Sequence, residues 1–148
     1  MHTPFFCRAG TAALLVTLIS GCRISSPPVV DSSEAPAATP QAAVDGFVSA
    51  VASRDVKRVG ALWGTRDGLL RDRISPVELE TRVGVIACYL GTSHFTTVGM
   101  MPDTADGVLA TLKSADNKRT ERVRAIKGQE GQWIVESLAM RKLDAGSC

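Results

Sequence analysis

The sequence lacks a hydrophobic run long enough to cross a bilayer. Its first apolar stretch, Ala12–Ile19, falls short of the roughly 20 residues that a spanning helix needs, even when residues 9–11 are included. No acidic residue precedes Cys22, and Arg8 makes the start weakly basic. A basic start, a short apolar core and then small residues are typical of a secretory signal peptide. This layout argues against a transmembrane helix.

An excess of charge of one sign is also missing, and histidine is scarce. The formal net charge is +2 over 148 residues. Nucleic-acid binding requires a clustered basic surface, so we expect no nucleic-acid partner. Beyond the leader, His94 is the only histidine, and no cysteine spacing indicates a metal site. We therefore expect neither a metal nor a cofactor.

The segment Leu18–Cys22 ends the apolar core with the small residues Ser20 and Gly21 before a cysteine. It resembles the lipobox of bacterial lipoproteins, although Ile19 stands where leucine is commoner. The resemblance implies cleavage before Cys22 and lipidation of this cysteine with a diacylglyceryl group and a third chain, such as palmitate. Stable anchoring requires more than one chain. The alternatives are ordinary secretion with an incidental Cys22, and a signal anchor that is never cut.

We expect three parts along the chain. Residues 1–21 form the signal peptide, residues 22–40 a lipidated, disordered tether rich in Ser, Ala and Pro, and residues 41–148 one domain. Aspartate directly after the lipidated cysteine favours inner-membrane retention in well-studied Gram-negative bacteria. Arg23 occupies that position here, which favours the outer membrane and its periplasmic face.

The four cysteines divide between these parts. Cys7 leaves with the signal peptide and Cys22 goes to lipid. Cys88 and Cys148 remain as a candidate disulfide in a compartment that permits one. Closing this long loop would stabilise the fold by about 3–4 kcal/mol in the chain-entropy model. The alternative is a buried thiol at Cys88 and a loose end at Cys148.

Hydrophobic spacing predicts helices first and strands later. The expected helices cover residues 40–52, 56–63 and 76–90, and the expected strands residues 94–101, 108–113, 122–126 and 133–139. Thr39, Asp55 and Ser75 are the expected N-caps, the last with Glu78 in a capping box. Residues 64–75 are expected to be a solvated connector. This order indicates an α+β fold whose strands form an antiparallel meander.

The same order of elements resembles the NTF2-like (cystatin-like) superfamily. The residues that carry the resemblance are Thr39–Val44, Phe47, Asp55, Leu62–Trp63, Gly131–Val135 and Leu138. The resemblance implies a cone in which N-terminal helices pack on a curved four-stranded antiparallel sheet and leave a pocket at the open end. Some members are isomerases or dehydratases, and others bind ligands or partners.

Four residues are candidates to line such a pocket: Tyr89, His94, Arg122 and Arg124. Tyr89 is the only tyrosine, and a packing role with its hydroxyl at the rim is the alternative. His94 opens a strand, where an exposed edge position is the alternative. Arg122 and Arg124 alternate with apolar neighbours and so share a face, which would bind an anion if concave and serve solubility if convex. No catalytic set matches an enzymatic motif of the family.

These observations favour a membrane-anchored, non-enzymatic module that binds a small ligand or an envelope protein. One alternative is a small-molecule isomerase or lyase, which needs an ionisable group inside an apolar cavity. Another is a structural envelope component, with a homodimer formed through the exposed sheet face.

Overall fold

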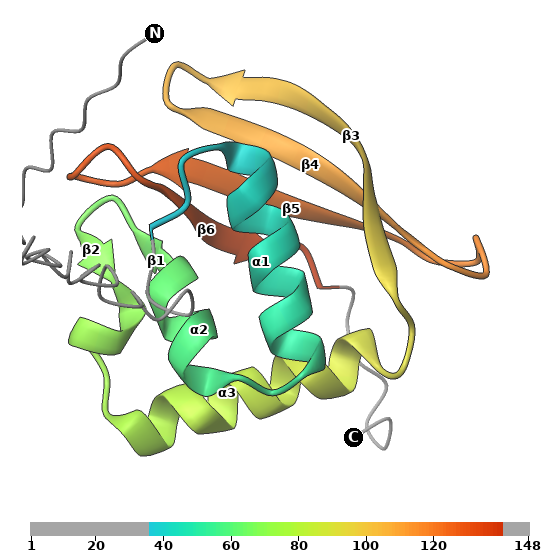
Figure 1. The fold of residues 1–148 in the computed structure, drawn as a ribbon, viewed down its shortest axis with the longest axis horizontal. Coiled ribbons are helices and arrows are strands. Elements are labelled where there is room, and N and C mark those ends of the chain that lie inside the picture. Colours follow the sequence, from blue (N-terminus) through green and yellow to red (C-terminus); the bar gives the residue numbers. More distant parts are fainter. Residues whose placement is uncertain (1–35, 141–148) are drawn as a thin grey trace, which may run out of the picture.

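The computed structural model describes residues 36–140, which fold into three α-helices packed against a four-stranded antiparallel sheet (Figure 1). In chain order the elements are α1 (Pro40–Ala52), α2 (Val56–Leu62), β1 (Gly64–Thr65), β2 (Gly68–Leu69), a 3-10 helix (Leu70–Asp72), α3 (Pro76–Leu90), β3 (Phe95–Thr104), β4 (Gly107–Ser114), β5 (Thr120–Lys127) and β6 (Trp133–Leu138). The sheet order β3-β4-β5-β6 is the predicted meander, and the α+β class is confirmed. The signal peptide, Cys22 and Cys148 lie outside the described residues.

Each α-helix begins at its predicted side-chain cap. Thr39, Asp55 and Ser75 each accept a hydrogen bond from the backbone N–H three residues later, at 2.9–3.2 Å. The carboxylate of Glu78 accepts a hydrogen bond from Arg82 at 2.6 Å, so the serine half of the predicted capping box is the half that forms here. Over residues 36–140, no helix has the length and apolar character needed to span a bilayer.

The core lies between α1 and the face of the sheet that the helices cover. Val44, Phe47 and Val51 of α1 are at most 1% exposed, and their spacing of three and four residues places them on one side of the helix. They share one buried cluster with Val123 and other inward-facing strand residues. The ring of Phe47 meets that of Trp63 edge-on, with centroids 6.1 Å apart. Packed side chains therefore fill the space under the middle of the sheet.

The two outer strands of the sheet, β3 and β6, differ in whether other segments form bridges along their free edges. On the β6 side, Ala37 forms an antiparallel bridge with Trp133, and Trp63 forms a parallel bridge with Val135. Ala37 is only 5% exposed. It lies inside the segment 22–40 that the sequence assigns to the tether, so the packed body begins within that segment.

Two other segments differ from the sequence prediction. Residues 64–75, expected to be a solvated connector, form the β1–β2 hairpin and then the 3-10 helix. Strand β3, expected to end at Met101, continues through Pro102 to Thr104. An edge strand tolerates proline because one side of its backbone has no ladder to complete, and a register shift between Pro102 and Thr104 accompanies it.

The β1–β2 hairpin depends on glycine at position 64. A Cβ atom at Gly64 would lie 2.5 Å from the carbonyl oxygen of Gly68, whereas one at Gly84 in α3 would meet nothing within 4 Å. We expect Gly64→Ala to lower the free energy of unfolding by about 1–3 kcal/mol, because the backbone must shift. The matched control Gly84→Ala should raise it by up to about 1 kcal/mol, since alanine is the better helix former. Urea denaturation of both variants measures this, and equal effects would contradict the assignment of the hairpin.

Candidate functional site

The four residues proposed to share a pocket lie in separate places. Tyr89, at the end of α3, is 7% exposed, whereas His94 is exposed between α3 and β3. Arg122 and Arg124 lie on β5, where they alternate with the buried residue Val123. The two arginines therefore share a face, as predicted, and it is the face opposite the helices. The structure does not gather the four residues into one pocket.

Arg124 is neutralised by carboxylates from both outer strands. Its Nε lies 2.5 Å from Oδ2 of Asp103 on β3, and its Nη1 donates to Glu136 on β6. The hydrogen bond to Asp103 and the charge of Glu136 hold the pKa of Arg124 above its ordinary value. Arg124 thus ties strands together on the outer face, and its neighbour Arg122 is an exposed charge.

A buried charged cluster that the sequence did not reveal lies where α3 meets the sheet. Glu121 is 4% exposed and accepts hydrogen bonds from the Tyr89 hydroxyl at 2.8 Å and from Arg119 Nη2 at 3.1 Å. Arg119 also donates to the carbonyl oxygens of Tyr89 and Leu90, both at 2.9 Å. Its guanidinium lies over the rings of Tyr89 and Phe95, 5.1 and 5.3 Å from their centroids. These contacts bind α3, β3 and β5 together, which is a stabilising role.

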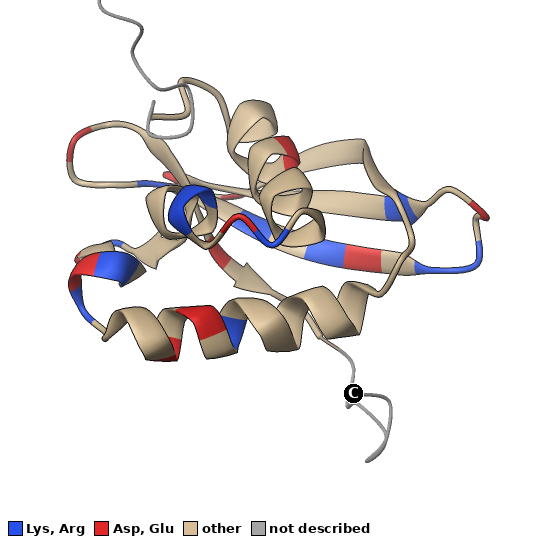
Figure 2. Ribbon diagram, turned by 60° about the horizontal axis from the view of Figure 1, so that its bottom comes forward, with Lys and Arg blue, Asp and Glu red and all other residues tan. Residues whose placement is uncertain are grey.

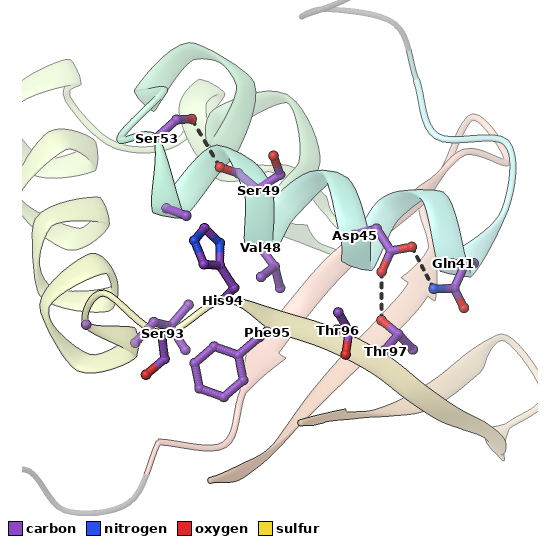
Figure 3. A pocket seen from close by; sticks show the side chains of 13 residues that line it. Gln41, Asp45, Val48, Ser49, Ser53, Ser93, His94, Phe95, Thr96 and Thr97 are labelled. Atoms are coloured by element: carbon purple, nitrogen blue, oxygen red, sulfur yellow. Dashed lines mark hydrogen bonds between the residues drawn. The ribbon is translucent and has the colours of Figure 1, made fainter. Parts of the chain in front are cut away.

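A groove of about 700 Å³ runs between α1 and the beginning of β3 (Figure 3). Its volume is in the range of small-molecule sites. The residues that line it are Gln41, Asp45, Val48, Ser49, Ala52, Ser53, Leu90, Gly91, Ser93, His94, Phe95, Thr96 and Thr97. One wall is therefore a flank of α1, and the other is the approach to β3 and its first three residues.

Asp45 is the polar centre of this groove. Its Oδ1 accepts a hydrogen bond from the Thr97 hydroxyl at 2.7 Å, and its Oδ2 accepts one from Gln41 Nε2 at 2.6 Å (Figure 3). Asp45 is the only charged residue of α1, seen in Figure 2 as one red band on an otherwise uncharged helix. Two donors fix the carboxylate, so a ligand would meet a negative charge already in position.

Apolar and hydroxyl side chains complete the groove. Val48 is 8% exposed and Ala52 is small, so they form a shallow apolar wall on α1. The imidazole of His94 projects from the start of β3 toward α1, near Ser49 (Figure 3). The arrangement can hold an apolar group beside Val48 and a hydrogen-bond donor or cation beside Asp45.

Of the four pocket residues predicted from the sequence, His94 alone lines this groove, and Asp45 was not predicted. The available signal was a single acidic residue on a helix with no other charge. Cys88 is disulfide-bonded in the structure. Cys148, its predicted partner, lies outside the described residues, so the pairing between these two cysteines stays a prediction.

Within residues 36–140, no group of three or more His, Cys, Asp or Glu side chains is placed to hold a metal ion. Comparison with known proteins gives no relative: no family model matches the chain, no curated protein is detectably similar to it, and no solved structure matches it. The groove is therefore interpreted from its own geometry.

Proposed function

We propose that this protein is a lipid-anchored bacterial envelope protein whose NTF2-like body binds an envelope ligand or partner in the groove between α1 and β3. The anchor rests on Cys22 in the lipobox-like segment Leu18–Cys22, and the body on its order of helices followed by a meander. The outer membrane and its periplasmic face are the proposed location, because Arg23 follows Cys22.

The single observation that carries the binding role is the pre-positioned carboxylate of Asp45 beside an apolar wall. A binding site needs a concave surface with a few fixed polar groups, and Gln41 and Thr97 fix this one. Holding the carboxylate in place before the ligand arrives reduces the entropy lost on binding.

Binding is favoured over the isomerase or lyase alternative by where the ionisable groups lie. Isomerases of this fold need an acid or base in a closed apolar cavity. In the groove, Asp45 and His94 are both exposed, and side chains such as Phe47 and Val123 occupy the space under the sheet. Solvent at both groups would screen the electrostatic effects on which such catalysis depends.

The proposal is tested by placing a photo-crosslinking amino acid at Ser49, an exposed residue of the groove, in cells that express the full-length protein. We expect an adduct of one reproducible mass at Ser49. The matched control is Thr81, an exposed residue of α3 away from the groove, which should give none. No adduct at Ser49, or the same adduct at both positions, would overturn the proposed function.

A further inference from the structure

Strand β3 presents backbone groups that its neighbour β4 does not use. The His94 carbonyl accepts a hydrogen bond from the Ala115 N–H at 2.9 Å. His94 and Ala115 are therefore a hydrogen-bonded pair, and the backbone groups of His94 point toward β4. Hydrogen-bonded and non-hydrogen-bonded pairs alternate in an antiparallel ladder. Phe95 and Thr97 therefore direct their N–H and C=O groups away from β4, toward the open edge.

A bond on the other side of β4 supports this orientation. The N–H of Ser114, the partner of Phe95 in the register, donates to the Arg119 carbonyl at 3.0 Å, toward β5. No hydrogen bond between described residues takes up the outward-facing backbone groups of Phe95 and Thr97. On the opposite edge of the sheet, β6 is bridged by Ala37 at Trp133 and by Trp63 at Val135.

The open edge and the groove coincide. The residues that point backbone groups outward, Phe95 and Thr97, also line the groove, and α1 forms its other wall. A space between an edge strand and a helix, with unsatisfied amides along the strand, is the geometry in which peptides add to a sheet as an extra strand. Main-chain hydrogen bonds then supply affinity, and pockets for alternate side chains supply specificity.

We propose that the groove takes an extended peptide that adds to β3 at Phe95–Thr97 and places a lysine or arginine beside Asp45; this deepens, and rests on, the binding function proposed above. Alternate residues of a strand point to the same face. The peptide residue opposite Phe95 then faces the apolar wall at Val48 and Ala52. The residue two positions along, opposite Thr97, faces the carboxylate.

The length of the occupant is limited by β3 itself. The register with β4 shifts between Thr97 and Gly99, Pro102 has no backbone N–H, and the groove contains no residue of β3 beyond Thr97, so the peptide is expected to pair only as far as Thr97. A second copy of the chain pairing through β3 would bring no cation to Asp45, because Phe95–Thr104 contains no lysine or arginine. Charge complementarity therefore selects a short basic peptide over a β3–β3 dimer.

The test uses the full-length lipidated protein in detergent micelles and the blocked peptide acetyl-Thr-Val-Thr-Lys-Thr-Val-amide, with binding followed by fluorescence anisotropy of a labelled copy. In antiparallel addition the amides of the lysine at position 4 and the valine at position 6 of the peptide, which lie opposite Thr97 and Phe95, donate to β3. We expect N-methylation of these two amides to weaken binding at least about tenfold, since two hydrogen bonds are lost. The matched control, N-methylation of the threonine amides at positions 3 and 5 of the peptide, which face away from β3, should change affinity less than about twofold.

The charge is tested in the protein. We expect Asp45→Asn to weaken binding of the lysine peptide about threefold, the size expected of an exposed ion pair. It should not change binding of the same peptide with norleucine in place of lysine. The control variant Glu130→Gln changes an exposed carboxylate in the β5–β6 turn and should leave both affinities as they are.

The outcomes separate this inference from the proposed function. Binding that N-methylation does not affect, or a β3–β3 dimer in sedimentation, overturns strand addition. If the peptide does not bind but Ser49 still gives its specific adduct, the groove has another ligand and only the inference fails. If neither is observed, the proposed function fails as well.

Discussion

Replacing Arg119 by alanine is expected to lower the free energy of unfolding by about 3 kcal/mol. The change removes the counter-charge of the buried carboxylate of Glu121 and the two hydrogen bonds that Arg119 donates to the carbonyl oxygens of Tyr89 and Leu90. Removing one partner of a buried pair costs more than the pair contributes, because the remaining charge stays buried without its counter-charge. The lower end of the usual range applies, since the Arg119 side chain is 33% exposed and water can partly replace it.

Urea denaturation of the oxidised protein at neutral pH measures this effect. Lys118→Ala is the matched control, because it removes a neighbouring charge that is exposed, and it should change stability by less than about 0.5 kcal/mol. In the Arg119→Ala background, Glu121→Gln should recover part of the loss by removing the unpaired charge. A loss under about 1 kcal/mol for Arg119→Ala would show that the cluster does not hold α3 to the sheet.

Replacing Cys22 by serine is expected to release the protein from the membrane fraction completely. Each buried methylene of an acyl chain contributes about 0.8 kcal/mol, so the proposed diacylglyceryl group with a third chain would be sufficient for the whole attachment. Serine offers no thiol to form the thioether. The measurement is the distribution of full-length protein between pellet and supernatant after ultracentrifugation of disrupted cells.

The sequence offers a matched control for this experiment. Cys7→Ser changes a cysteine within residues 1–21, before the expected cleavage site, and should leave both processing and sedimentation unchanged. If Cys22→Ser still sediments with the envelope, lipidation is not the anchor. The α1–β3 groove would keep its geometry in that case, because it is formed by residues 41–97.

The helices and the main sheet were predicted well from short-range features of the sequence. Thr39, Asp55 and Ser75 act within one turn of their helices, so their caps are readable from spacing alone. Hydrophobic periodicity also placed the helices and the meander, because α1 and the central strands each bury one face. The prediction of a solvated connector at residues 64–75 was wrong, because strands of two residues are too short to show an alternation of apolar and polar side chains.

The sites were harder to predict because they join distant parts of the chain. The hydrogen bond between Thr97 and Asp45 links residues 52 positions apart, and that between Tyr89 and Glu121 links residues 32 apart. No spacing rule connects such pairs, so nothing in the sequence marked Arg119 and Glu121 as partners of Tyr89. His94 was singled out because it is the only histidine beyond the leader. Its rarity does not indicate which residues lie near it in the fold.

The asymmetry of the sheet has a consequence for assembly. A protein whose sheet has two open edges can pair with another copy at each edge and so form a filament. Among residues 36–140, Ala37 and Trp63 bridge the β6 edge at Trp133 and Val135, whereas the backbone groups of Phe95 and Thr97 on β3 face outward. Strand addition at β3 would therefore give a stoichiometry of one peptide per molecule, and a molecule bound in this way would not extend into a filament.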